Sequence, residues 1–176
     1  MALLHYCTSH YDDWAKEIPA SEAHFKPGAF GENIYNAEVS EKNICIGDRL
    51  AIGEIIVEVT MPRAPCYKLN HRFEVKDMAK RSQILFRTGW LYRIIKSGHV
   101  AAGDMIRLLE RPHPDWTVAR VMYYLYIETD NKEMMEEIVE IPQLGKEIKS
   151  TFHARLAKGV TAVSYTHLTL PTILRV

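Results

Sequence analysis

Apolar residues in the first part of the chain come in short runs separated by glycines and polar residues. The aliphatic runs fall at 44–46, 49–52, 55–60 and 100–109. Short runs that are rich in β-branched side chains and bounded by turn residues are typical of strands. We therefore expect an antiparallel sheet or barrel, in which 100–109 forms a pair of strands broken at Gly103-Asp104.

Helical spacing interrupts this pattern in two places. Tyr11, Trp14 and Ile18 share one face of a short segment that acidic residues open and Pro19 ends. Acidic residues in the first turn and a proline after the last are features of a helix, so we expect one over 11–18. A second helical segment is expected near 77–82.

From Trp116 onward the apolar residues recur with a helical period of about 3.6. Thr117 is expected to cap a first helix, and Asp130 or Asn131 a second. A third helix carries apolar residues at every fourth position, namely Leu144, Ile148, Phe152 and Leu156. We therefore expect an α+β protein, with a mostly antiparallel, barrel-like β domain followed by a small C-terminal three-helix bundle.

The strand over 55–60 leads into a loop that contains the most suggestive chemistry of the chain. Pro62 and Pro65 each fix their own φ and favour an extended residue before them, so this loop should be stiff. It is expected to present Arg63, Cys66, Lys68 and Asn70 close together. Nearby positive charge favours the thiolate, which is the form of cysteine that binds soft metals.

A second interpretation of this loop stays open on the residues alone. A lone cysteine after a strand is often a small buried apolar residue, and Arg63 and Lys68 can simply be solvated. Cys45, which lies between two isoleucines, is expected to be a core residue for the same reason.

Three residues outside or at the end of this loop are weaker candidates. Asn33 follows a glycine-containing turn and either binds a ligand or caps the turn. His71 lies close enough in sequence to reach the site, but no second ligand lies at metal-site spacing. Trp90 either forms an aromatic wall for a planar substrate or packs in the core. A dinucleotide fingerprint of the Gly-x-Gly-x-x-Gly type is absent from the sequence, so we expect neither nicotinamide nor flavin.

Composition limits the class of partner. The 176 residues carry no net charge and 47% apolar residues, which offers no electrostatic attraction to nucleic acid or to a membrane surface. The first residues lack the pattern of a secretory signal, and three cysteines at unrelated spacings do not form a disulfide framework. We expect a cytoplasmic protein that binds neither membrane nor nucleic acid.

Several segments, in their order along the chain, resemble the MOSC domain family and within it the YiiM-like branch. They are Phe30-Gly-Glu-Asn33, Ile46-Gly-Asp48, Pro62-Arg-Ala-Pro-Cys-Tyr-Lys-Leu69, Gly89-Trp-Leu-Tyr92 and Arg111-Pro-His-Pro-Asp-Trp-Thr-Val-Ala-Arg120. The resemblance implies a β-rich fold that holds molybdenum cofactor (molybdopterin) through Cys66. It also implies reduction of N-hydroxylated compounds such as hydroxylaminopurine, and a C-terminal helical domain.

The resemblance also assigns roles to the candidates. Cys66 is expected to be the metal ligand and the catalytic residue, with Arg63 and Lys68 on the cofactor phosphate. The remaining cofactor-binding candidates are Asn70, His71, Glu32, Asn33 and Trp90. Electrons are expected from a separate reductase, because the protein has no flavin or nicotinamide site of its own.

Two other classes of function stay open. The domain can be a carrier of molybdenum cofactor or of sulfur, with a persulfide on Cys66, or the helical part can make it a docking module. Descriptions of the family also mention pyridoxal phosphate, but we find no lysine in a site of that kind.

We expect the β domain to span 1–115 and the helical domain 116–160. YiiM-like proteins have a further N-terminal part, with a His-Gly-Gly motif, before the segment that matches Leu3-Leu-His-Tyr6. We therefore expect the chain to be a truncated fragment that lacks strands and one wall of the site. The segment 163–176 resembles translated sequencing-adapter DNA, so we expect it to be a non-native tail and assign no role to His167.

Overall fold

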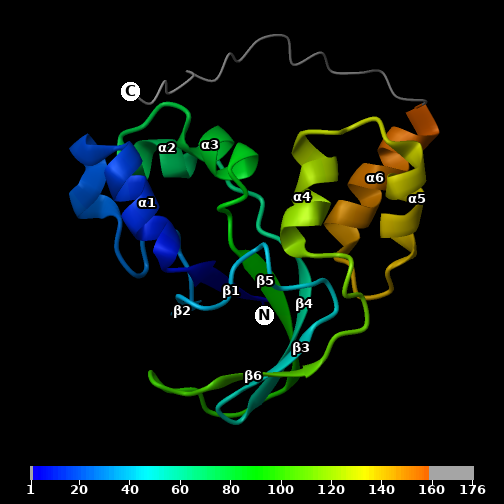
Figure 1. The fold of residues 1–176 in the computed structure, drawn as a ribbon, viewed down its shortest axis with the longest axis horizontal. Coiled ribbons are helices and arrows are strands. Elements are labelled where there is room, and N and C mark those ends of the chain that lie inside the picture. The colour runs from blue at the N-terminus through cyan, green and yellow to red at the C-terminus, as the bar shows by residue number, and fades with distance from the viewer. Residues whose placement is uncertain (1, 159–176) are drawn as a thin grey trace, which may run out of the picture.

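The computed structural model describes residues 2–158, and its centre is a six-stranded sheet (Figure 1). The strands are Ala2–Cys7 (β1), Ile34–Asn36 (β2), Arg49–Ile52 (β3), Ile55–Pro62 (β4), Trp90–Lys96 (β5) and Ile106–Glu110 (β6). Their order across the sheet is β2-β1-β5-β4-β3-β6. Every neighbouring pair is antiparallel except β1 and β2, which are parallel. The sheet curls into a half-barrel, so the expected α+β class with a barrel-like, mostly antiparallel sheet is confirmed.

Helices fill the connections and follow the sheet. Between β1 and β2 lie Ser9–Glu17 (α1) and a 3-10 helix, Pro19–His24 (η1). Between β4 and β5 lie Lys68–Phe73 (α2) and Met78–Ile84 (α3). The last three helices are Val118–Tyr126 (α4), Lys132–Glu140 (α5) and Lys146–Lys158 (α6). In Figure 1, α1, α2 and α3 gather at the upper left and α4, α5 and α6 at the upper right, both above the sheet.

The expected helical bundle is present with the expected caps. Thr117 Oγ1 accepts a hydrogen bond from the amide of Arg120 at 3.1 Å. At the second helix the cap is Asn131, whose Oδ1 accepts from the amide of Met134 at 3.1 Å. The segment 163–176, with His167, lies outside the described residues.

The strand pair expected over 100–109 is wrong in its first half. Only 106–110 forms a strand, β6. Upstream, the Asp104 side chain accepts from the amide of Ala101 at 2.8 Å, and the Asp104 amide donates to the Ala101 carbonyl at 3.2 Å. These two bonds close a turn through Gly103, whose φ of +94° suits glycine. The turn therefore replaces the expected strand.

Two hydrophobic cores lie on either side of β1. The main core joins the inner face of the sheet to the helical bundle and includes Val57, Trp90 and Val121. The second core is largely aromatic and packs α1, η1 and α2 together, with Tyr6 stacked on Phe30 at 4.2 Å between ring centroids. None of the described helices has the length and apolar character needed to cross a bilayer.

The helical bundle is joined to the sheet close to the Cys66 loop. The amide of Gly145 donates to the carbonyl oxygen of Thr60 at 3.0 Å. A Cβ on Gly145 would lie 2.5 Å from the sulfur of Met61, so a larger residue there would require the Met61 side chain to move.

Candidate cofactor site

Cys66 lies in an exposed position at the end of the proline-containing loop. β4 ends at Pro62, and the chain stays extended until the Cys66 carbonyl accepts a hydrogen bond from the amide of Leu69 at 3.0 Å. That bond begins the turn into α2. Cys66 is exposed, whereas Cys7 and Cys45 are buried. Of the two interpretations left open by the sequence, a buried apolar Cys66 does not agree with this placement, while Cys45 is the core residue that was expected.

Arg63 is the half-buried cation of this loop, and its guanidinium is incompletely satisfied. Its Nη2 donates to the carbonyl oxygen of Phe30 at 3.2 Å, and its backbone amide donates to the carbonyl oxygen of Gly89 at 3.0 Å. Its Nη1 is buried and has no partner among the described residues. Burial lowers the pKa of Arg63, and electrostatic attraction to Cys66 opposes that shift.

The unsatisfied nitrogen is the feature that points to a ligand. A buried donor left without a partner costs about 1–3 kcal/mol, so such groups in folded proteins normally have an explanation. A guanidinium can bind an anion such as phosphate through two parallel hydrogen bonds. Arg63 Nη1 is therefore a buried donor that none of the described residues uses.

Glu32 is buried and already holds three donors. Its carboxylate accepts from the amides of Gly28 at 2.6 Å and Phe30 at 2.9 Å, and from the hydroxyl of Tyr11. Burial and the bond to Glu32 raise the pKa of Tyr11. Glu32 thus shapes the loop whose Phe30 carbonyl receives Arg63, which makes its influence on the site indirect.

Two asparagines among the candidates connect neighbouring segments through side-chain hydrogen bonds to the backbone. Asn33 Oδ1 accepts from the amide of Leu4 at 2.9 Å and thereby fastens its loop to β1. Asn70 Nδ2 donates to the carbonyl oxygen of Lys76 at 2.6 Å, and its Oδ1 accepts from the amide of Ala79 at 2.8 Å. The Asn70 side chain therefore joins α2 to α3.

The other two loop-side candidates lie on the surface of α2. Lys68, the first residue of that helix, is exposed. His71 is exposed too, and it lines an open depression of about 450 Å³ together with Asn70, Glu74 and Lys76. The expectation that Arg63, Cys66, Lys68 and Asn70 share one loop needs a correction, because α2 begins at Lys68.

Trp90 does not face the loop surface. Its side chain is 0% exposed and packs against the ring of His5 at a tilt of 31°, with 4.4 Å between centroids. His5 is buried as well, and burial lowers its pKa from 6.5 to about 4. Of the two interpretations of Trp90, core packing describes what the structure contains. The aromatic residue exposed beside Cys66 is Tyr67, at 67%, which no sequence motif had singled out.

Among the described residues no three His, Cys, Asp or Glu side chains gather closely enough to hold a metal ion on their own. Cys66 therefore offers a single thiol ligand. A metal that brings its own sulfur ligands, as molybdenum does in its dithiolene cofactor, needs only one ligand from the protein. The exposed thiol and the unsatisfied Arg63 nitrogen together fit such a group.

Two family models match the chain. The MOSC domain matches residues 1–107, and the YiiM-like 3-alpha helix domain matches residues 116–159. The chain belongs to the MOSC domain family. Within that family it is similar to proteins that carry the same helical domain after the β domain.

Two similar proteins, and a crystal structure of one of them, give the scale of the likeness. A protein named Reductase from Gibberella moniliformis is 37% identical over 142 residues, which is 80% of this chain and 25% of that protein. Protein YiiM from Escherichia coli is 41% identical over 110 residues, 62% of this chain and 49% of that protein. The crystal structure of YiiM from Escherichia coli superposes with a TM-score of 0.85 and 33% identity, covering 90% of this chain and 78% of that one. The chain thus spans a quarter to a half of the length of the two curated relatives.

Proposed function

We propose that this MOSC protein binds molybdenum cofactor with Cys66 as the protein ligand of the metal, and reduces N-hydroxylated bases or related compounds. The observation that carries the proposal is the pairing of an exposed Cys66 thiol with a buried, unpartnered Arg63 Nη1 on one short loop. The name Reductase of one relative supports an oxidoreductase.

The residues of this loop have distinct tasks in the proposal. Cys66 binds the metal as a thiolate, and Arg63 binds the cofactor phosphate through its free Nη1. Lys68 adds a point charge at the start of α2, in solvent. Glu32, Asn33 and Asn70 hold the segments around the loop, and His71 lies beside it on the surface of α2.

The proposed reaction breaks an N–O bond. A hydroxylamino group takes up two electrons and two protons, and yields an amine and one water. The bound molybdenum cofactor supplies the redox centre for this two-electron transfer. Both electrons come from a separate reductase protein, and both protons from solvent.

A second function rests on the exposure of Cys66. As a carrier, the domain accepts a sulfane sulfur from a persulfide donor, so that Cys66 becomes a persulfide and the donor leaves as a thiol. An accessible thiol beside a cation suits that transfer as well.

The decisive experiment replaces the thiol. Cys66→Ser should abolish molybdenum retention in protein purified from cells that make the cofactor, whereas the matched variants Cys7→Ser and Cys45→Ser should keep it. Equal molybdenum content in Cys66→Ser and the parent would refute the assignment. Turnover of an N-hydroxylated base by the loaded parent then separates the enzyme from the carrier, which binds without turnover.

A further inference from the structure

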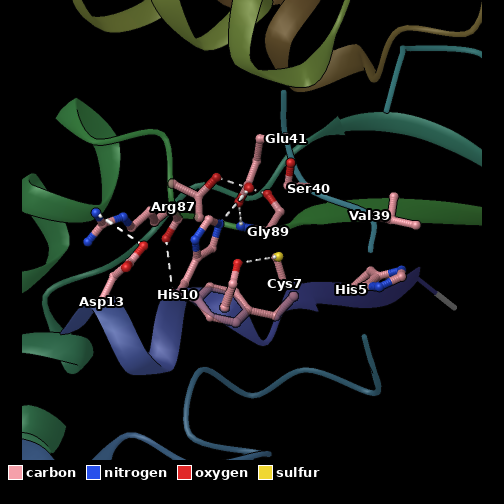
Figure 2. Close-up of polar contacts among 12 residues, drawn as sticks. His5, Cys7, His10, Asp13, Val39, Ser40, Glu41, Arg87 and Gly89 are labelled. Atoms are coloured by element: carbon pink, nitrogen blue, oxygen red, sulfur yellow. Dashed lines mark hydrogen bonds and ion pairs between the residues drawn. The ribbon is translucent and has the colours of Figure 1, made fainter. Parts of the chain in front are cut away.

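Glu41 is a buried carboxylate, 1% exposed, in the loop between β2 and β3. Its Oε1 accepts from the amide of Gly89 at 2.7 Å, and its Oε2 is 2.8 Å from Nε2 of His10. Figure 2 shows His10 of α1 and Gly89 converging on this one side chain. No motif in the sequence pointed to Glu41.

Gly89 passes this contact on to the Cys66 loop. Its carbonyl oxygen accepts from the backbone amide of Arg63 at 3.0 Å. Its φ is +74°, and a Cβ there would lie 2.3 Å from the carbonyl oxygen of His5. Gly89 is therefore confined between β1 and the loop, so the bond to Glu41 on one side and the bond to Arg63 on the other are made by a peptide segment with little freedom to move.

The backbone of Glu41 extends the connection to the helical domain. Its carbonyl oxygen accepts from the amide of Ala119, in the first turn of α4, at 2.8 Å. One residue thus connects α1, α4 and the start of β5. The same Gly89 accepts a hydrogen bond from the backbone amide of Arg63, and Cys66 follows Arg63 by three residues.

Asp48 shows what a purely structural carboxylate of the same kind looks like. It is 0% exposed, its Oδ2 accepts from the amide of Cys45 at 2.9 Å, and it pairs with Arg111 at 2.7 Å. Asp48 therefore matches Glu41 in burial, in one backbone donor and in one basic side chain. Within residues 2–158, its side-chain hydrogen bonds go to Cys45 and Arg111 and not to Gly89 or Arg63.

We propose that Glu41 is a positioning residue that holds Arg63 beside Cys66 through the amide and carbonyl of Gly89. The inference rests on the proposed function only for the purpose of that positioning, which is to present the Arg63 guanidinium to the cofactor phosphate. Without Glu41 the buried Gly89 amide loses its acceptor, the segment shifts, and Arg63 is no longer held in its place on the Cys66 loop.

The test measures the alkylation rate of Cys66 by iodoacetamide in the full chain without cofactor, followed by peptide mass spectrometry. Glu41→Ala should change the rate at Cys66 about threefold, because the loop that carries Cys66 is no longer fixed to Gly89 through Arg63. The rate should move toward that of Arg63→Gln, the reference without the charge. Glu41→Gln should restore most of the parent rate, since its amide oxygen still accepts from Gly89.

The control variant is Asp48→Ala, which should lose thermal stability as Glu41→Ala does and leave the Cys66 rate unchanged. Labelling of the buried Cys7 and Cys45 in the same samples reports general unfolding. If Glu41→Ala lowers the melting temperature but keeps the parent rate at Cys66, the positioning role is refuted.

Should Glu41→Ala fail to fold, Glu41→Asp replaces it. The shorter side chain loses reach to Gly89, so it should change the rate at Cys66 where Glu41→Gln does not, and equal rates in the two variants refute the proposal. Because alkylation needs no molybdenum, its result stands apart from the fate of the proposed function. That function fails on the metal content of Cys66→Ser alone.

Discussion

The guanidinium of Arg63 donates from Nη2 to the carbonyl oxygen of Phe30 at 3.2 Å, so the segment before β2 holds the loop that follows β4. This single bond fixes the plane of the guanidinium and leaves Nη1 as its buried, unpartnered end. Two loops that are distant in sequence therefore share one cation.

Arg63→Lys should separate ligand binding from stability. Lysine keeps the charge but loses the planar fork, so molybdenum retention should fall several-fold. The free energy of unfolding should change by less than about 1 kcal/mol, because the lost bond to Phe30 is offset by removal of an unsatisfied buried donor. Molybdenum content and urea unfolding measure the two effects.

Arg72→Lys is the matched control for that variant. Arg72 also donates to a carbonyl of the same loop, that of Gly28 at 3.5 Å, but it is exposed. Arg72→Lys should leave both the molybdenum content and the free energy of unfolding unchanged. If Arg63→Lys retains as much molybdenum as Arg72→Lys, the phosphate role of Arg63 is wrong.

Glu32→Gln should destabilise the protein in the absence of any ligand. The carboxylate of Glu32 accepts from two backbone amides and from Tyr11, and a glutamine turns an NH₂ group toward one of these donors. We expect a loss of about 2–4 kcal/mol in the unfolding free energy, within the range for disrupted buried hydrogen bonds to a charged group. Urea unfolding of the cofactor-free chain measures this loss. If Glu32→Gln is as stable as the parent, Glu32 is not a structural residue and a direct role in binding the cofactor is favoured.

Acid should weaken the fold through His5. Burial lowers its pKa from 6.5 to about 4, opposed by a hydrogen bond to Asn36 and by attraction to Glu41. The unfolded chain binds a proton below 6.5 and the folded chain only near 4, so this stabilisation is complete above pH 6.5 and is lost as the pH falls toward 4.

The measurement compares unfolding free energies at pH 7 and pH 5 in the parent and in His5→Gln. Removing the titrating group should reduce the loss between the two pH values by about 2 kcal/mol. A parent and a variant with the same pH dependence would show that His5 does not carry the effect.

Gly89→Ala should be far more costly than Gly103→Ala. Both positions have positive φ, but a Cβ at 89 would lie 2.3 Å from the His5 carbonyl oxygen, whereas a Cβ at 103 would have nothing within 4 Å. We expect about 1 kcal/mol for Gly103→Ala from backbone strain, and about 3 kcal/mol or more for Gly89→Ala. Thermal unfolding of the two variants measures the difference, and equal losses would contradict the close packing of Gly89 on β1.

Local patterns predicted much of the fold. The caps at Thr117 and Asn131 were readable because a cap depends on a few neighbouring residues. The strand at 55–60 was readable because a β-branched run is a local signal. The parallel pairing of β1 with β2 was not, since it depends on the crossover through α1 and η1.

The candidate site was predicted in part. The loop between β4 and α2 and its cysteine were identified, but α2 was not expected at Lys68. Leu69 and Phe73 lie four residues apart and bury into the aromatic core, and this tertiary contact favours a helix over a stiff loop. The burial of Trp90 could not be predicted from the sequence either. Whether a strand residue faces solvent depends on which other strands and helices cover that face of the sheet.

The position of β1 between the two cores has a consequence for synthesis. His5 packs on Trp90 in the direction of the main core, and Tyr6 packs on Phe30 in the aromatic core. β1 leaves the ribosome before β2, β3 and β4, yet its antiparallel partner is β5. β2 can pair with one edge of β1 early, but the other edge of β1 and the main core wait for β5 and the helical bundle. The nascent chain therefore exposes an unpaired strand edge throughout that interval and is a natural client for chaperones.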